Sequence, residues 1–334
     1  MNRLFISVVV GSLLTIIDTY PAYARFLPAI GNKQGANTLT YPVVRTTKSK
    51  KNLQVIKALE DALTLSRFKN GGEVHTLAVL NDNGESVTGV DISLELNRYN
   101  LNSFDVIKNL AFDDVVKLVR SIPKKVTVKY TDLLPSVAGD KHLAIGINYT
   151  EHGKETGQVK PFMFPKFVKT DPFIHELNYT KGWLLDYEVE LGIVFPSTVC
   201  SVENLNRSMV GFLVVNDFTD RALLMRKMDS QNVTGGKGFP DAKSKKGFLP
   251  TGPYLVIPKD WRAFVQEIQL KLTVNGMVRQ IGSAKDMVWN IEKIIEKSLS
   301  MKGENKSYYQ DKMVKLFEGD CIPANSIIIT GTPA

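Results

Sequence analysis

The sequence predicts an α+β fold in which short strands outnumber helices. From about Leu133 onward, short apolar stretches are separated by Gly, Pro and Asp, with strands expected over 143–147, 188–195, 210–216, 254–257, 270–274 and 326–330. One clear helix interrupts them, with Asp286 as its expected cap and an apolar face that runs to Leu299. Because strands and helices do not alternate strictly, a doubly wound parallel sheet is not favoured. Neither GxGxxG nor GxxxxGK[ST] occurs, so nucleotide binding has no support.

The N-terminal 24 residues have the three regions of a secretory signal peptide. Arg3 supplies a positive start, residues 4–17 are apolar and uncharged, and Ala22-Tyr23-Ala24 provides a small-x-small cleavage pattern. We therefore expect an exported protein, periplasmic or secreted, with no stable membrane insertion after cleavage. A retained membrane anchor is the alternative. Residues 25–50 are polar and turn-rich and are expected to form a flexible arm.

Residues 51–135 are expected to form a small N-terminal α+β domain. Leu53, Ile56, Leu59 and Leu63 have helical spacing, and residues 74–80 alternate as in a strand. A turn over 81–84 leads into a second strand. A helix capped by Ser103 then follows, with its apolar side running from residue 107 to residue 119. Residues 136–334 are expected to form the catalytic domain.

Composition limits the function classes. The chain has 334 residues, of which 43% are apolar and 23% charged, as in an ordinary globular protein. Lys and Arg number 42 against 34 Asp and Glu, and this net charge of +8 suits nucleic acid, an anionic membrane or small anionic substrates. The lysines are dispersed and no recognition helix is predicted, so nucleic acid is not favoured. Two cysteines exclude a disulfide framework and thiolate zinc sites, and they permit one disulfide without requiring it.

Three carboxylates suggest a site for a hard cation. In a strand over 188–195, Glu188 and Glu190 project from one face, where they would repel each other if buried. A solvent-facing strand edge is the alternative explanation for this pair. Asp217 favours the cation site over the solvent-facing edge, because it follows an almost continuously apolar strand at 210–215. Three carboxylates with few histidines suit Mg²⁺ or Mn²⁺ rather than zinc.

A candidate base lies in the same half of the chain. His152 and Glu155 are three residues apart, which places them on one side of a helical turn. A carboxylate that contacts an imidazole fixes its tautomer and raises its basicity, although a surface ion pair would have the same spacing. A lysine of the loop 235–253 near the cation would suit a substrate carboxylate or a developing oxyanion. Thr332 follows the last predicted strand and offers a hydroxyl beside backbone amides.

The order of these motifs resembles the fumarylacetoacetate hydrolase family. The series is NYTEHGKE, DYEVELGIV, VVNDFTDR, KSKKGFLPTGP, VNGMVRQIGSAKDM and IIITGTPA, which covers roughly residues 140–334, with weaker similarity over about 60–135. The resemblance implies a mixed β-strand roll or sandwich, which is usually dimeric and contains Mg²⁺ or Mn²⁺. It also implies a small anionic 2-oxo acid as substrate.

The resemblance also assigns roles to individual residues. It implies that Glu188, Glu190 and Asp217 are the metal ligands and that His152 and Glu155 activate water. Lys243 matches the family lysine by its spacing to Phe248-Leu249-Pro250. The remaining positions would contact the substrate, and they are Gln280, Thr332 and Arg221.

The implied reaction is hydrolysis of a carbon–carbon bond in an acylpyruvate- or fumarylacetoacetate-type 2-oxo acid. The alternatives are an oxaloacetate-type decarboxylase or a 2-hydroxydienoate isomerase on the same site, and a catalytically silent secreted relative that binds a small anion or a partner protein.

Three departures from the family pattern carry further expectations. Where the family reads Val-Ser-Ala-Arg-Asp, this chain has Phe218-Thr219-Asp220-Arg221-Ala222, so the acid after the arginine is absent and weaker support of the metal ligands is expected. Relatives continue beyond the position of Ala334, so we expect either that the sequence is incomplete or that the last strands of the roll are missing. An export signal is unusual in the family, which suggests an unusual substrate.

Overall fold

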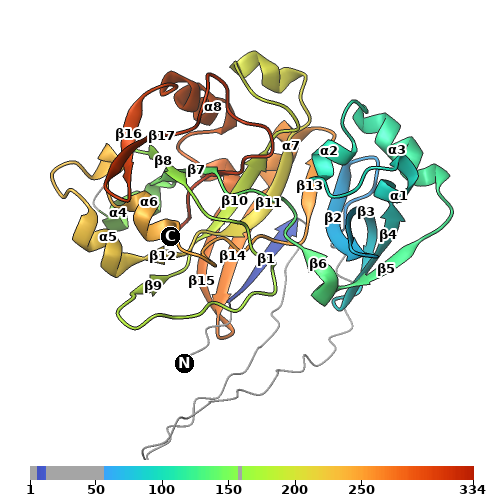
Figure 1. Cartoon of the computed structure of the whole chain (residues 1–334), viewed down its shortest axis with the longest axis horizontal. Coiled ribbons are helices and arrows are strands. Elements are labelled where there is room, and N and C mark those ends of the chain that lie inside the picture. Colours follow the sequence, from blue (N-terminus) through green and yellow to red (C-terminus); the bar gives the residue numbers. More distant parts are fainter. Residues whose placement is uncertain (1–5, 13–55, 157–159) are drawn as a thin grey trace, which may run out of the picture.

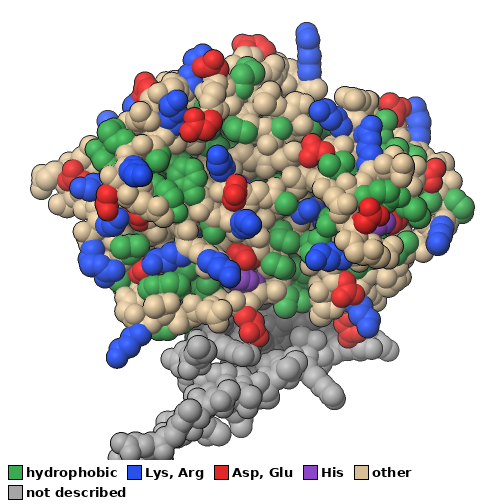
Figure 2. Space-filling view, in the orientation of Figure 1, with side chains coloured by type: hydrophobic (Ala, Val, Ile, Leu, Met, Phe, Trp, Pro, Cys, Tyr) green, Lys and Arg blue, Asp and Glu red, His purple; other side chains and the backbone are tan. Residues whose placement is uncertain are grey.

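The computed structural model describes residues 6–12, 56–156 and 160–334. It has the predicted α+β architecture, dominated by a large mixed sheet. Figure 1 shows the elements of the N-terminal unit on one side of the molecule and those of the larger roll on the other. On the face drawn in Figure 2, Lys and Arg side chains are interspersed with Asp and Glu and do not form one continuous basic surface.

The N-terminal unit is an antiparallel sheet with three short helices. The strands are β2 (Ala62–Asn70), β3 (Glu73–Asp82), β4 (Ser86–Asp91), β5 (Val126–Lys129) and β6 (Leu133–Leu134). The helices are α1 (Ile92–Leu96), α2 (Ser103–Val106) and α3 (Phe112–Ser121), followed by the 3₁₀ turn η1 (Tyr130–Asp132).

The roll contains most of the strands. They are β7 (His142–Gly146), β8 (Phe162–Lys166), β9 (Leu185–Asp186), β10 (Val189–Val194), β11 (Gly211–Asn216), β12 (Thr219–Asp220), β13 (Leu255–Pro258), β14 (Ile268–Val274), β15 (Met277–Ser283), β16 (Asn305–Tyr309), β17 (Lys312–Lys315) and β18 (Ile328–Ile329). The helices are α4 (Thr150–Thr156), α5 (Arg221–Lys227), α6 (Phe239–Lys243), α7 (Trp261–Glu267) and α8 (Ile291–Ser300), with 3₁₀ turns η2 (Val202–Asn206), η3 (Val233–Gly235) and η4 (Ala284–Asp286).

One long sheet joins the two units. Its order in the described part of the chain is β5-β4-β3-β2-β13-β11-β10-β18-β7-β8, with β6 paired to β2. The junction is the antiparallel pair β2–β13, in which Leu65 lies opposite Leu255 and Leu63 opposite Ile257. The predicted boundary at residues 135 and 136 therefore falls within a structure whose sheet continues across it.

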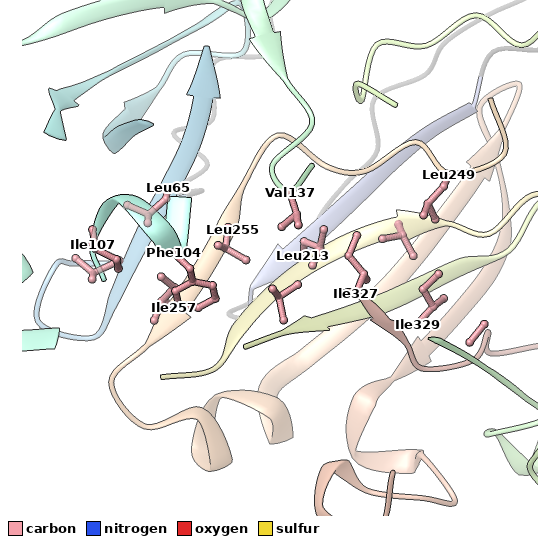
Figure 3. Packing of buried hydrophobic residues seen from close by; sticks show 14 of the residues in the cluster. Leu65, Phe104, Ile107, Val137, Leu213, Leu249, Leu255, Ile257, Ile327 and Ile329 are labelled. Carbon is pink, nitrogen blue, oxygen red and sulfur yellow. The ribbon is translucent and has the colours of Figure 1, made fainter. Parts of the chain in front are cut away.

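The hydrophobic core also continues from one unit into the other. In the cluster of Figure 3, Leu65, Phe104 and Ile107 of the N-terminal unit pack with Leu255 and Leu213 of the roll. A second cluster lies on the other face of the roll strands, so alternate residues of β10 and β11 enter different clusters. The strands that carry the predicted acids are thus fixed by packing on both faces.

Three sequence predictions of helices are wrong in detail. Leu63 lies in β2, because pairing with β3 and β13 outweighs its helical spacing to Leu59. The helix expected to run through Ile107 to Val119 is broken into α2 and α3, and Asn109 between them has a φ of 72°. Ser103 is the first residue of α2 rather than its cap.

The helix expected after Asp286 also begins later than predicted. α8 starts at Ile291, and its cap is Asn290, whose side chain accepts from the Lys293 N–H at 2.9 Å. Asp286 lies in the preceding turn η4. The hairpin predicted at 81–84 is confirmed, since it joins β3 to β4.

Most of the predicted signal peptide and all of the predicted arm at 25–50 lie outside the described residues. Residues 6–12 of the signal segment form β1 (Ile6–Ser12), which pairs antiparallel with β14. Processing of this segment stays a prediction. No helix among the described residues is long and apolar enough to cross a bilayer.

The two cysteines form a disulfide. Cys200 and Cys321 lie 121 residues apart in the chain, with Cα atoms 4.4 Å apart. Their neighbours Val199 and Ile322 form an antiparallel bridge, exchanging backbone hydrogen bonds of 3.0 and 2.9 Å. The bond therefore links the loop after β10 to the segment that leads into β18.

Candidate active site

The three predicted acids converge where β10 and β11 meet. Glu188 immediately precedes β10, Glu190 lies within it, and Asp217 immediately follows β11. The antiparallel register places Val189 opposite Asn216, and the Asp217 N–H donates to the Glu188 carbonyl at 2.9 Å. Glu188 and Glu190 lie two residues apart, so their side chains point to the same face, and the register brings Asp217 next to Glu188.

The acids are almost completely buried and close enough to share one ion. Glu188, Glu190 and Asp217 are 5%, 2% and 1% exposed, and one ligand atom from each lies within 4.8 Å of the others. Burial, followed by the charges of Asp217 and Glu188, raises the pKa of Glu190 well above its usual value. A cation would relieve this repulsion. The all-oxygen donor set and its spacing therefore fit a hard divalent ion.

Two cationic side chains reach these carboxylates from within the roll. Lys243, at the end of α6, donates to Glu188 Oε2, and to Asp217 Oδ2 at 2.6 Å. Burial lowers the pKa of Lys243, but the three acids outweigh burial and raise it. Arg221 donates from Nη2 to Glu188 Oε1 at 2.5 Å and from Nε to Asp186 Oδ2 at 2.8 Å. Two predicted site residues thus lie against the acids.

Lys166 is a site residue that sequence reasoning missed. It ends β8 and is fully buried, where its Nζ donates to Asp217 Oδ1 and to the Phe248 carbonyl at 2.9 Å. The available signal was a lysine within the apolar run of residues 162–167. Asp217 was predicted from a similar signal, an acid at the end of an apolar strand, and a buried charge of either kind needs a partner.

The loop after β18 supplies further contacts. The Gly331 N–H donates to Glu190 Oε2, and the Thr332 hydroxyl donates to the Val189 carbonyl at 3.0 Å. Gln280 of β15 accepts from the Val189 N–H at 3.0 Å and donates to Thr332 Oγ1 at 2.9 Å. Gln280 and Thr332, predicted to contact substrate, thus lie together beside the acids.

The predicted base lies on α4, which follows β7 after a short segment that contains Asn148. His152 is partly exposed, and α4 also carries Glu155 three residues later. The Glu155 side chain lies outside the described part of the structure, so its contact with His152 stays a prediction. Asn148, which was not singled out, donates to the Thr330 carbonyl at 2.9 Å and accepts from the Trp289 N–H at 2.7 Å. The first bond ties the segment before α4 to the loop at Gly331, and the second ties it to the segment before α8.

The altered segment around Arg221 does not leave the acids unsupported. The family acid after the arginine is absent, but Arg221 Nε donates to Asp186 Oδ2. Asp220 is buried and caps α5, accepting from the Leu223 N–H at 3.2 Å. It also lies 3.3 Å from Lys245 Nζ. The Arg221 guanidinium that contacts Glu188 is therefore still held by an acid, and how well this segment supports a bound metal stays a prediction.

The sequence comparisons point to one family. Residues 141–334, more than half of the chain, match the family described as fumarylacetoacetate (FAA) hydrolase C-terminal. A 2,4-didehydro-3-deoxy-L-rhamnonate hydrolase of Sphingomonas is 31% identical over 204 residues, covering 58% of this chain and 61% of that protein. A mitochondrial oxaloacetate tautomerase of Homo sapiens is 27% identical over 223 residues, covering 65% of this chain and 63% of that protein. The matches thus span less than two thirds of either relative.

Solved structures share the fold. A fumarylacetoacetate hydrolase from Exiguobacterium antarcticum superposes with a TM-score of 0.54 at 23% identity, covering 81% of this chain and 87% of that one. A 5-carboxymethyl-2-hydroxymuconate delta-isomerase from Mycobacterium smegmatis gives a TM-score of 0.53 at 18% identity, covering 81% and 88%. At these identities the likeness concerns the fold alone.

Proposed function

Because the chain belongs to the fumarylacetoacetate hydrolase family, we propose that it is a Mg²⁺- or Mn²⁺-dependent hydrolase. Its substrate would be a 2-oxo acid of the acylpyruvate type, cleaved at a carbon–carbon bond. The observation that carries this proposal is the buried trio of Glu188, Glu190 and Asp217, whose ligand atoms lie within 4.8 Å of one another. Such a cluster is expensive to bury, and Lys243, Lys166 and Arg221 compensate only part of that cost, because the pKa of Glu190 stays well above its usual value.

The three acids would hold the cation. When bound, it would supply Lewis-acid polarisation of the 2-oxo group of the substrate. Lys243 Nζ donates to Glu188 Oε2 and to Asp217 Oδ2. Its ammonium group therefore lies beside the acids, where it would attract a substrate anion bound to the cation. Gln280 and Thr332 would contact the substrate carboxylate, for which the Gln280 amide would turn away from the Pro333 carbonyl and the Thr332 hydroxyl away from the Val189 carbonyl.

His152 would act as the general base. His152 is partly exposed on α4, so water can approach this residue, and Glu155 would orient the ring. His152 removes a proton from water, and the oxygen of that water attacks the distal carbonyl. Cleavage of the carbon–carbon bond then releases a carboxylic acid and leaves its electron pair as an enolate. Lys243 and Gln280 stabilise this charge until the enolate carbon takes up a proton.

Proton transfer on oxaloacetate is the second candidate reaction. It is favoured by the similarity to a tautomerase that is named for that substrate. The same lysine and amide would stabilise an enolate without any attack by water. Decarboxylation and isomerisation of a 2-hydroxydienoate would use the same groups.

Turnover assays test the proposal. Acylpyruvates and oxaloacetate are incubated with the protein in Mg²⁺ or Mn²⁺, with and without EDTA, and the products are identified. Metal-dependent release of pyruvate from an acylpyruvate is expected, whereas tautomerisation or decarboxylation alone would identify the second candidate. Absence of metal-dependent turnover on every substrate would favour the silent anion- or partner-binding relative.

A Glu188→Gln variant tests the cation site separately. Because an ion that binds only the folded state raises the melting midpoint, Mn²⁺ should stabilise the wild type and fail to stabilise this variant. Glu85→Gln, at an exposed position of the hairpin before β4, is the control and should retain the shift. An equal shift in both variants would place the ion elsewhere.

We also propose that the protein is an exported homodimer. The Cys200–Cys321 disulfide supports export, because such bonds persist in oxidising compartments. N-terminal sequencing of the exported protein should begin at Arg25, and light scattering should give twice the mass of one processed chain.

A further inference from the structure

Each carboxylate of the trio has one oxygen engaged by a donor of the surrounding fold. Arg221 Nη2 donates to Glu188 Oε1 at 2.5 Å, Lys166 Nζ donates to Asp217 Oδ1, and the Gly331 N–H donates to Glu190 Oε2. The opposite oxygens of Glu188 and Asp217 are the ones that Lys243 contacts. A metal ion that enters the site would therefore compete with Lys243 for Glu188 Oε2 and for Asp217 Oδ2.

This pattern bears on which ion the site accepts. Ca²⁺ takes six to eight oxygens and commonly binds carboxylates through both of theirs, whereas Mg²⁺ requires an octahedron of closer ligands. A carboxylate oxygen that accepts a hydrogen bond keeps a second lone pair, but the bond fixes the orientation of the group. With one oxygen directed at its donor, only the other is directed at the ion, and bidentate binding would require the carboxylate to turn. Three such ligands occupy half of an octahedron and leave the rest for water or substrate. A calcium ion would gain no bidentate carboxylate here and would need more waters to reach seven or eight oxygens, so it should bind less tightly.

We propose that Lys166, Arg221 and the Gly331 N–H set the ion selectivity of this site by restricting the three acids to monodentate binding. The inference rests on the proposed function, because it presupposes the cation site. Lys166 is a positioning residue here, since it acts through Asp217 and does not itself touch the ion.

The surroundings of the donors keep the restriction in place. Lys166 is fully buried, and its second hydrogen bond, to the Phe248 carbonyl at 2.9 Å, holds its ammonium group at two points. Arg221 is likewise held by Asp186 at 2.8 Å. If Asp217 or Glu188 rotated toward bidentate binding, the side chain of Lys166 or Arg221 could not move with it and its hydrogen bond to the carboxylate would be lost.

A simpler role for Lys166 would be to balance charge. Loss of its charge would then strengthen binding of every divalent ion to the same extent, since Mn²⁺ and Ca²⁺ carry equal charge. The ratio of the two dissociation constants cancels this effect and isolates the geometric one.

Calorimetric titration of the full chain with Mn²⁺ and with Ca²⁺ tests the proposal. The wild type should prefer Mn²⁺, and in Lys166→Met the ratio of the Ca²⁺ to the Mn²⁺ dissociation constant should fall about tenfold, the lower end of what partners of metal ligands contribute. Lys259→Met removes a comparable lysine–carboxylate pair, of 2.8 Å to Asp113, at the surface of the N-terminal unit. It should leave the ratio unchanged.

A second variant covers the case in which Lys166→Met does not fold. Arg221→Gln frees Glu188 Oε1 at a position that is only partly buried, and it should shift the ratio in the same direction. An unchanged ratio in the folded variants would overturn the selectivity proposal while leaving the cation site intact. Failure of the wild type to bind either ion would instead refute the cation site, and with it the proposed function.

Discussion

At the scale of the residue, His142 shows how one buried side chain affects stability against acid. It lies in β7, where its Nδ1 accepts from the Ile327 N–H at 3.2 Å and 1% of the residue is exposed. Burial, reinforced by the nearby charge of Lys166, lowers its pKa from 6.5 to about 4. The folded protein therefore holds this ring neutral at pH values where the unfolded chain would protonate it.

We predict that His142 makes the protein less stable in mild acid. The unfolded chain binds the extra proton below about pH 6.5, so the free energy of unfolding should fall as the pH drops from about 6.5 toward 4. The contribution should be about 2 kcal/mol between pH 7 and pH 4.5. Urea titrations at both pH values measure it. In His142→Asn, whose amide oxygen can still accept from Ile327, the pH dependence should be smaller by this amount. An identical pH dependence in both proteins would contradict the assignment.

At the scale of the element, the loop after β18 joins fold to site through Gly331. Its φ is +96°, and a Cβ there would lie 2.8 Å from the Asn148 Cβ. Its N–H is also the donor to Glu190. The loop thus requires glycine both for its backbone conformation and for its close contact with the segment that begins α4.

We predict that Gly331→Ala lowers both stability and cation affinity. Strain and displacement of the loop should reduce the free energy of unfolding by about 1–3 kcal/mol. The Mn²⁺ dissociation constant should rise about tenfold as the N–H leaves Glu190. Gly319→Ala is a matched control, because Gly319 has a φ of +79° with nothing within 4 Å of its Cβ position. It should share the backbone strain but not the loss of affinity, and equal affinities in the two variants would contradict this role.

Elements also divide what could be predicted from what could not. The strands at 188–195 and 210–216 were predictable, because each is an apolar run with acids at one end, the start of the first and the end of the second. Such a pattern indicates a buried strand with a candidate site at that end. The region around Leu63 was not, because its spacing fits a helix and only pairing with β3 and β13 makes it a strand. Lys166 was missed because its partner Asp217 is 51 residues away. Two cysteines separated by 121 residues likewise carry no pairing signal of their own.

At the scale of the whole molecule, the disulfide should contribute strongly to stability. A crosslink that closes a loop of 121 residues lowers the entropy of the unfolded chain and so raises its free energy by about 4–5 kcal/mol. We predict that a reductant lowers the urea midpoint accordingly. The double variant Cys200→Ser/Cys321→Ser should unfold at the lower midpoint with or without reductant. If reduction left the wild-type midpoint unchanged, the bond would not be stabilising the fold.

The continuity of sheet and core leads to a prediction about cooperativity. Because β2 pairs with β13 and Leu255 packs between Phe104 and Leu213 in one cluster (Figure 3), the N-terminal unit and the roll should unfold together. The three tryptophans lie beyond residue 135 and report on the roll, while amide exchange along β3 reports on the N-terminal unit.

Both probes should therefore give one free energy of unfolding. Leu255→Ala should lower it by about 2–5 kcal/mol in each, because the cavity lies at the junction that both units share. Leu94→Ala is the control, since Leu94 is 54% exposed and its truncation should change neither value appreciably. The contrary outcome is that amide exchange along β3 gives an opening free energy much lower than the free energy of unfolding measured by the tryptophans. That result would show that the N-terminal unit opens by itself. In that case the shared sheet would be a contact between two independent units and would not be part of a common core.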